Sequence, residues 1–237
     1  DSVDLPGATN APELPGGAQD AVVMLLDSGS YEPLWITRLG GSGNDWARVV
    51  ALAADGDVLV AGYTESAFTS PTPGAFQPTN GGGRDGFVAR LGPSGDTLRA
   101  WTFVGGPGFD GFLGGGVDAD GNVCGFGFAG PGFPAHLATR QRASSAVAGS
   151  FVARVSGDGA RLDYATIVSG ALPEGLNVTA CDVDAAGRVA LCGFLTRSVD
   201  AIPMPVTDYQ CVAALLDTNV AGSASLPWLH VFGGSSD

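Results

Sequence analysis

Residues 87–91 read Phe-Val-Ala-Arg-Leu, and residues 151–155 read Phe-Val-Ala-Arg-Val, 64 positions further along the chain. Two weaker copies, Ala-Val-Val-Met-Leu at 21–25 and Cys-Val-Ala-Ala-Leu at 211–215, keep nearly the same spacing. Inside and outside positions alternate in these segments with the period of two that indicates a β-strand, and no window shows a sustained helical period. The sequence therefore predicts a β-rich unit that repeats about every 64 residues.

Two further landmarks return in the same order in each unit. An apolar segment ends in a glycine pair at Gly40-Gly41, Gly105-Gly106 and Gly233-Gly234, with Ser169-Gly170 as a degenerate version. Turn sequences then follow at Ala54-Asp55-Gly56-Asp57, Ala119-Asp120-Gly121-Asn122 and Ala185-Ala186-Gly187-Arg188. Asp-Gly between apolar residues favours a hairpin, because glycine adopts the positive φ that the turn needs. Each unit is thus predicted to supply four strands, for example 112–118, 122–129, 151–155 and 161–168.

Four strands per unit are the strand count of one β-propeller blade. The predicted fold is all-β, a β-propeller of four-stranded antiparallel blades with about three and a half repeat units. We expect one domain over 1–237, with units near 20–85, 86–149, 150–209 and 210–237, and 1–19 as the tail of a preceding unit. A four-stranded sheet cannot bury both faces alone, so neighbouring units must stack.

Pro-rich connections of unequal length separate the second and third strands of each unit, at about 64–85, 129–149 and 195–209. The repeat predicts that all three emerge on one side of the assembly. Because loops on a rigid scaffold often carry function, this rim is the expected place for a binding site.

Composition excludes several classes of partner. The chain of 237 residues carries 24 acidic and 11 basic residues, a formal charge of −13. Such a surface repels phosphate backbones and anionic lipid, so we expect no nucleic acid partner and no membrane insertion. No apolar run reaches the roughly 20 residues that span a bilayer.

Four cysteines, Cys124, Cys181, Cys192 and Cys211, show no C-x-x-C spacing, which argues against a zinc or redox motif. Cys181 and Cys192 lie on the two arms of one predicted hairpin, where a cross-strand disulfide is conceivable in an oxidising compartment. Buried free thiols are the favoured interpretation for all four.

Five segments in order resemble the bacterial SBBP-type β-propeller repeat. They are Leu-Gly-Gly-Ser-Gly-Asn-Asp-Trp-Ala at 39–47, Ala-Asp-Gly-Asp-Val at 54–58, Gly-Tyr-Thr at 62–64, Pro-Gly-Ala-Phe-Gln at 73–77 and Asp-Gly-Phe-Val-Ala-Arg-Leu at 85–91. Later units lack the Pro-Gly-Ala-Phe-Gln segment. The resemblance implies an exported bacterial protein, located extracellularly, at the cell surface or in the periplasm. The sequence holds four copies of the 87–91 type of hairpin but only three of the Asp-Gly hairpin, so we expect further propeller segments or another chain to complete the ring.

Acidic residues after the glycine pairs form the first candidate site. Asp45, Asp110 and Glu174 share one position of the repeat. Converging on the axis, they would form a ring of carboxylates with raised pKa values. A repeated turn, in which each acid accepts backbone N–H bonds, is the simpler interpretation and is favoured.

The turn Asp118-Ala119-Asp120-Gly121-Asn122 resembles the start of a calcium loop, with oxygen ligands at Asp118, Asp120 and Asn122. The closing bidentate Glu is missing, and Ala53 and Ala186 stand at two of these positions in other units. A hairpin turn is therefore favoured over a Ca²⁺ site, and no cofactor is expected.

Three other sequence features give weaker evidence for a functional site. Residues 125–130 match G-x-G-x-x-G, but Pro residues follow where a dinucleotide site needs a helix, so this site is rejected. His230 takes a strand position that is Thr37, Thr102 and Thr166 in other units, and the interpretation is a tolerated strand residue. His136 lies beside Arg140 and Arg142 in a variable loop, where the default is a solvated loop.

Every recurrent residue is thus explained by the fold, and no singular polar constellation stands out. We expect a non-enzymatic structural or interaction module that contacts protein or glycan partners through loops or open blade edges. The alternatives are a propeller enzyme that acts on polysaccharide, with carboxyl pairs about 5 to 9.5 Å apart, and a calcium-stabilised adhesin.

Overall fold

The computed structural model describes residues 17, 19–67, 72–134, 148–168, 176–195, 210–220 and 227–232. Throughout these residues the chain forms strands and turns without a helix, which confirms the predicted all-β class. Accordingly, no helix in this part of the chain could cross a membrane.

Three four-stranded antiparallel sheets account for most of the strands, and neighbours in sequence are neighbours in each sheet. The first sheet contains β3 (Asp45–Leu52), β4 (Val58–Thr64), β5 (Asp85–Leu91) and β6 (Leu98–Val104). The second contains β7 (Gly111–Val117), β8 (Val123–Ala129), β9 (Gly149–Val155) and β10 (Leu162–Ile167). The third contains β11 (Leu176–Val183), β12 (Arg188–Leu195), β13 (Gln210–Asp217) and β14 (Trp228–Phe232). A two-stranded sheet of β1 (Ala21–Leu26) and β2 (Pro33–Leu39) precedes them.

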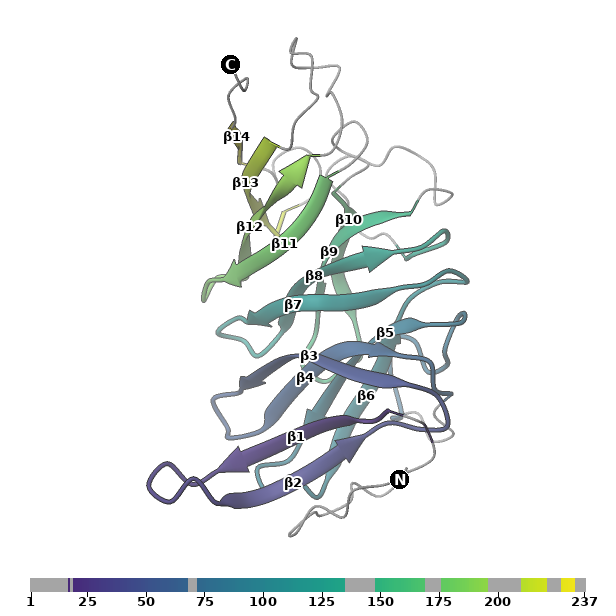
Figure 1. The fold of residues 1–237 in the computed structure, drawn as a ribbon, viewed down its shortest axis with the longest axis vertical. Coiled ribbons are helices and arrows are strands. Elements are labelled where there is room, and N and C mark those ends of the chain that lie inside the picture. The colour runs from purple at the N-terminus through teal and green to yellow at the C-terminus, as the bar shows by residue number, and fades with distance from the viewer. Residues whose placement is uncertain are drawn as a thin grey trace.

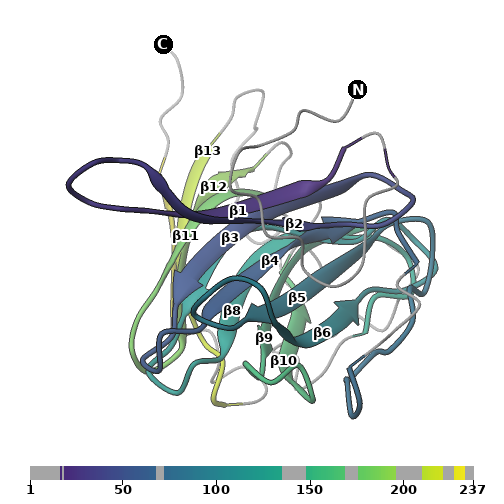
Figure 2. The same ribbon diagram turned by 90° about the horizontal axis from the view of Figure 1, so that it is seen from below.

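The sheets are stacked in chain order, with the β1–β2 sheet at one end and the third sheet at the other (Figure 1). Seen from the β1–β2 end, each following sheet lies behind the previous one with its strands turned further (Figure 2). Strands β3, β7 and β11 come first in their sheets, and β7 lies against both of the others. Stacked, blade-like sheets are therefore what the repeat builds.

Strand register confirms the predicted four-strand unit. The strands expected at 112–118, 122–129, 151–155 and 161–168 correspond to β7, β8, β9 and β10, with ends shifted by at most two residues. In each four-stranded sheet the first two strands form one hairpin, here called the inner hairpin, and the last two form the outer hairpin. The β1–β2 sheet matches an outer hairpin alone, because Val23 pairs with Thr37 as Val88 pairs with Thr102. The unit bounds near 85 and 149 thus fall inside sheets.

Glycine at two repeated positions has a physical reason. The predicted turns hold Gly56, Gly121 and Gly187 at φ values of 86°, 79° and 77°, a region that favours glycine. On the following strand, a Cβ built on Gly62 would lie 1.8 Å from the carbonyl oxygen of Trp46, and one on Gly127 would lie 1.8 Å from that of Gly111. The partner strand comes so close at this bulge that no side chain fits.

The hydrophobic core lies between the sheets. Phe87, Ala89 and Leu91 point from β5 toward the β1–β2 sheet and belong to one buried cluster with Trp35 and Leu39. Phe87 also stacks on Trp101 of the neighbouring strand, with ring centroids 4.5 Å apart. Two further clusters fill the next two gaps in the stack. Because each gap is closed by residues of two units, the sheets depend on one another for burial.

The described part of the first long connection has a structural role. Residues 72–77, which include the Pro-Gly-Ala-Phe-Gln segment, run along the free edge of β6. The amide of Trp101 donates to Thr72 Oγ1 at 2.7 Å, and the amide of Phe103 donates to the Gln77 carbonyl oxygen at 3.0 Å. This segment thus covers an edge strand, which otherwise exposes unpaired backbone groups.

The cysteines are free thiols, but they are not all buried. Cys124 is buried and Cys181 partly so, and burial raises the pKa of each thiol to about 12. Cys192 and Cys211 are exposed, which contradicts the expectation of four buried thiols. The register pairs Cys181 with Leu191 and Cys192 with Ala180. The side chains of Cys181 and Cys192 therefore point to opposite faces of the sheet and are poorly placed for a disulfide.

Candidate functional site

A repeated backbone contact joins neighbouring sheets. The amide of Asp45 donates to the Gln19 carbonyl oxygen, and the amide of Asp110 donates to the Arg84 carbonyl oxygen, both at 2.8 Å. In each junction the start of an inner hairpin meets the residues just before an outer hairpin of the preceding sheet. The two junctions are 65 residues apart in sequence, so the repeat extends to the contacts between sheets.

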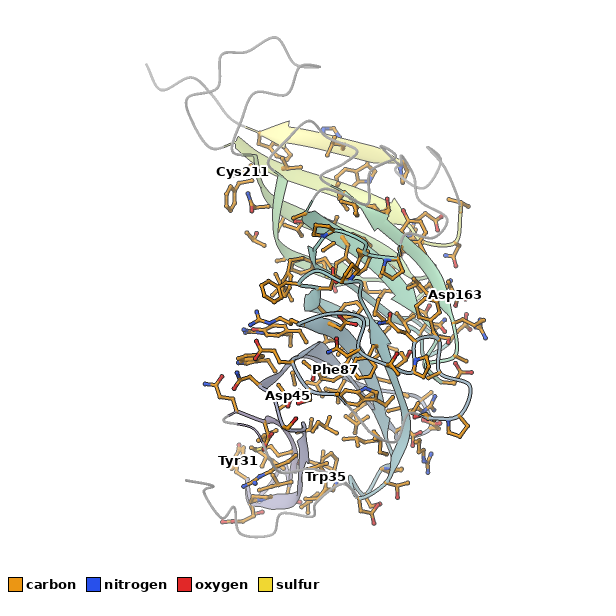
Figure 3. All side chains as sticks on the ribbon, turned by 90° about the vertical axis from the view of Figure 1, so that its right-hand side faces the viewer. Tyr31, Trp35, Asp45, Phe87, Asp163 and Cys211 are labelled. Carbon is orange, nitrogen blue, oxygen red and sulfur yellow. The ribbon has the colours of Figure 1, made fainter. Side chains whose placement is uncertain are left out.

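The carboxylate of Asp45 is occupied by groups of its own junction. It accepts hydrogen bonds from the Gly41 amide at 2.9 Å, from Ser66 Oγ at 2.8 Å and from the Thr64 hydroxyl. Only 1% of Asp45 is exposed, and in Figure 3 its label lies between those of Trp35 and Phe87 along the stack. These contacts match the turn interpretation of this acid.

Asp110 repeats the arrangement with backbone donors alone. Its two carboxylate oxygens accept the amides of Gly106 and Gly130, each at 2.7 Å, and the residue is fully buried. Burial raises the pKa of this carboxyl although both amides oppose the rise. The acid thus fixes the glycine pair and the end of β8, and neither Asp45 nor Asp110 faces solvent.

The first glycine of each pair makes room for a second acid. A Cβ on Gly40 would lie 2.5 Å from Asp20 Oδ1 and 2.7 Å from Asp45 Oδ2. A Cβ on Gly105 would lie 2.6 Å from Asp85 Oδ1. Each junction therefore holds two acids, Asp20 with Asp45 in one and Asp85 with Asp110 in the other.

Asp85 is fully buried and only half satisfied. Its Oδ2 accepts the Gly81 amide at 2.7 Å and Gln77 Nε2 at 2.8 Å, whereas Oδ1 has no hydrogen-bond partner. Burial raises the pKa of Asp85 to about 6, and the nearby charge of Asp110 adds to the rise. Sequence reasoning missed this acid, although it begins the strand that defines the repeat.

Glu174, the third predicted acid of the series, lies outside the described residues. Strand pairing places Leu176 opposite Leu195, as Asp45 lies opposite Thr64. The backbone position of Asp45 and Asp110 is therefore held by Leu176 in the third sheet.

Asp118 acts as a turn residue. Its Oδ1 accepts the amides of Asp120 and Asn122 at 3.0 and 2.9 Å, and Arg154 Nη2 lies 2.7 Å from its Oδ2. Asp120 points outward, with 84% of its side chain exposed. Because Asp118 is already paired with Arg154 and bonded to amides of its own turn, these contacts match the hairpin interpretation. Among the described residues, no group of three His, Cys, Asp or Glu side chains is placed to hold a metal ion.

The two histidines differ in what the structure describes. His136, with Arg140 and Arg142, lies outside the described residues. His230 pairs with Ala213, the register of Thr102 opposite Val88, as predicted. It is exposed and lies between the rings of Trp228 and Phe232 on the same face of β14, at centroid distances of 5.5 and 6.2 Å.

A singular set of side chains does gather at the junction of the first two sheets. Arg84 lies over three aromatic rings, with its Cζ atom 5.2 Å from the centroid of Trp46, 5.1 Å from Tyr63 and 5.5 Å from Phe109. Trp46 and Tyr63 themselves pack at 4.7 Å. We name these four residues the arginine–aromatic cluster.

Polar groups hold this cluster in place. Arg84 Nη2 contacts Glu65 Oε1 at 2.6 Å, and this contact lowers the pKa of Glu65. Asn44 Nδ2 donates to the same carboxylate at 2.8 Å. Arg48 donates to the Tyr63 hydroxyl at 2.9 Å and makes no carboxylate ion pair with any described residue. Phe109 is 66% exposed, Trp46 and Arg84 are partly exposed, and Tyr63 is buried beneath them at 7%.

Most of these residues depart from the repeat, whereas Tyr63 keeps an aromatic position that Phe128 and Phe194 share. Strand register matches Trp46 with Gly111 and Asn177, and the bulge residue Arg48 with Leu113 and Thr179. Glu65 corresponds to Gly130 in the second sheet. The expectation that no singular polar constellation exists is therefore wrong. The sequence signal for this cluster is the set of positions at which the aligned units differ.

Comparison with protein-family models found no match, and comparison with curated proteins found no similar sequence.

Proposed function

We propose that this protein is a non-enzymatic interaction module of an exported bacterial protein, and that it binds its partner through the arginine–aromatic cluster. The observation that carries the proposal is the contrast between two kinds of residue. Acids that recur are buried and bonded within the scaffold. By contrast, Trp46, Arg84 and Phe109 differ from the repeat and gather where Phe109 is largely exposed.

The composition of the cluster favours a protein partner. Trp, Tyr and Arg are the residues that most often dominate binding energy at protein interfaces, especially where their neighbours fix them. Arg84 is held by Glu65, and Arg48 leaves a positive charge beside the rings of an acidic protein. A partner with a carboxylate opposite Arg48 and an apolar group on Phe109 fits this surface. A glycan partner, with sugar rings on the exposed aromatic face, is the second outcome that the experiment separates.

The same contacts weaken the alternatives. A glycosidase needs carboxyl groups that reach its substrate, and Asp45 and Asp110 are at most 1% exposed. A calcium-stabilised adhesin needs oxygen ligands that Arg154 does not already pair with.

In this proposal the three four-stranded sheets are blades of a propeller. The meander order within each sheet, the stack and the contacts of β7 with β3 and β11 support that architecture. The resemblance to the SBBP-type repeat supports export to the cell surface, the extracellular space or the periplasm.

The test compares wild-type protein with two variants, Phe109→Ser within the cluster and Arg48→Glu beside it. Each is immobilised and exposed to solubilised envelope proteins of the source bacterium, and each is also run in affinity gels that contain neutral or acidic polysaccharide. We expect one envelope protein to bind the wild type and to bind each variant at least about 30-fold more weakly, the loss typical of an interface hot spot of 2 kcal/mol.

Phe76→Ser is the matched control, because Phe76 is also an exposed Phe but lies in the 72–77 segment. Equal capture by wild type and both variants would overturn the assignment of the cluster. Retardation only in the polysaccharide gels, lost in both variants, would replace the protein partner with a glycan.

A further inference from the structure

Cys124 and Cys181 lie on the two walls of one buried gap. Cys124 belongs to β8 of the second sheet and is fully buried. Cys181 belongs to β11 of the third sheet and packs against the same hydrophobic cluster. Both side chains therefore point into the gap between the second and third sheets, which follow each other in the stack (Figure 1).

The two sheets approach each other closely at this place. A Cβ built on Gly116 would lie 3.3 Å from the Cβ atom of Val183. Gly116 pairs directly with Cys124 in the second sheet, and Val183 lies two positions after Cys181 on β11. Because the Cβ atoms of a disulfide are about 3.5–4.5 Å apart, the gap is narrow enough here for such a bond.

Each thiol has groups of the opposite sheet beside it. Burial is the main cause of the raised pKa of both thiols, and smaller contributions identify their neighbours. The amide of Phe126, on β8, opposes the rise in the pKa of Cys181. The hydroxyl of Thr218, which follows β13, opposes the rise in the pKa of Cys124, and a negative charge on Cys181 adds to that rise. The two sulfur atoms are thus neighbours across the gap.

The pair departs from the repeat at both of its positions. Strand register matches Cys124 with Leu59, and Cys181 with Gly115. The gap between the first and second sheets therefore has a large side chain at one of these positions and no side chain at the other. The next gap has a cysteine at each position, so two thiols stand on facing walls.

We propose that Cys124 and Cys181 form a disulfide when the chain folds in an oxidising environment, and that this bond joins the second sheet to the third. Cys192 and Cys211, which are exposed, stay thiols. The bond involves no residue of the arginine–aromatic cluster, so it forms whether or not that cluster binds a partner.

A small disulfide such as oxidised glutathione is the oxidant. One cysteine thiolate attacks a sulfur of this disulfide, whose S–S bond breaks and releases a glutathione thiolate. The other cysteine then attacks the protein sulfur of the mixed disulfide and releases the second glutathione. Two electrons and two protons pass to glutathione while one S–S bond forms in the protein. Because a pKa of about 12 leaves little thiolate in the folded protein, we expect the bond to form before the sheets close.

Refolding of the reduced, unfolded chain in a glutathione redox buffer tests the proposal. Iodoacetamide in urea then labels every cysteine that is still a thiol. Trypsin cuts this lysine-free chain only after arginine and therefore gives each cysteine a peptide of its own, namely 100–140, 162–188, 189–197 and 198–237. Mass spectrometry should show 100–140 linked to 162–188, and label on the other two peptides.

Reduction gives a second readout. A phosphine reductant should lower the melting temperature of the refolded wild type by about 5–15 °C, the shift expected for loss of one disulfide in a chain of this size. Cys181→Ser, at the partly buried position, should melt near the reduced wild type and should not respond to the reductant. Cys192→Ser is the matched control, because it removes an exposed thiol and should keep both the linked peptides and the shift.

Three results would overturn the proposal. They are label on all four cysteine peptides of the refolded wild type, a link between 162–188 and 189–197, and a response to the reductant that persists in Cys181→Ser.

Discussion

The amide of Asp110 donates to the carbonyl oxygen of Arg84 at 2.8 Å, and this bond joins the second sheet to the first. Around it, the Asp110 carboxylate accepts two glycine amides, and the Arg84 side chain reaches the surface cluster. One junction thus contains both the repeated scaffold and the residues that break the repeat. An equivalent backbone bond joins Asp45 to Gln19, without an arginine at that position.

Asp110→Ala should strongly destabilise the protein. The change leaves the amides of Gly106 and Gly130 buried without an acceptor, at a cost of about 1–3 kcal/mol for each group. Urea unfolding should show a loss of about 2–6 kcal/mol. Asp120→Ala is the control, because 84% of that side chain is exposed, and it should change stability by less than about 0.5 kcal/mol. Equal effects of the two substitutions would contradict the role given to Asp110.

The stability that the protonated Asp85 carboxyl contributes should fall as pH rises from about 4 to about 6. Burial raises the pKa of Asp85 from 3.8 to about 6, so in this range the folded protein binds a proton that the unfolded chain has released. The contribution of this proton is present below pH 4 and is lost as pH rises through about 6. Asp20 and Asp110 shift in the same direction.

Asp85→Asn removes one titrating group and should reduce the slope of unfolding free energy against pH between 4 and 6. Asp120→Asn, at an exposed position, should keep the wild-type slope. An unchanged slope in Asp85→Asn would show that Asp85 titrates normally in the folded protein.

Removal of calcium should leave the melting temperature unchanged, because the contacts of Asp118 are made within the chain. Asp118→Ala should instead lower stability by about 1–3 kcal/mol, since buried donors of the turn lose their acceptor. Thermal unfolding with excess CaCl₂ and with EDTA measures the first, and Asp120→Ala again serves as control for the second. A calcium-dependent rise in melting temperature that Asp118→Ala abolishes would favour the adhesin alternative.

The fold was predictable because its signals are local. Alternation in 87–91, the glycine of the hairpin turn and the glycine pair each follow from backbone geometry, and each recurs at one spacing. The order of the strands, and the fact that the predicted unit bounds fall inside sheets, could be learned only from the strand pairing.

The site was less predictable because its parts are distant in sequence. Trp46, Arg84 and Phe109 meet only when β7 lies against β3, and no local pattern marks that contact. Asp85 was missed for a similar reason. Its burial depends on the missing side chain of Gly105, which is visible only when the two residues face each other.

Hydrogen exchange at the amides of Asp45 and Asp110 tests most directly the claim that the repeated sheets are joined into one stack. Both amides donate across a junction to the preceding sheet. We predict that NMR shows them exchanging only through global unfolding, as slowly as the central amides of β5 and β8. Rapid exchange at Asp45 and Asp110, with protection confined to strands inside each sheet, would contradict the account, because it would mean that the sheets open independently.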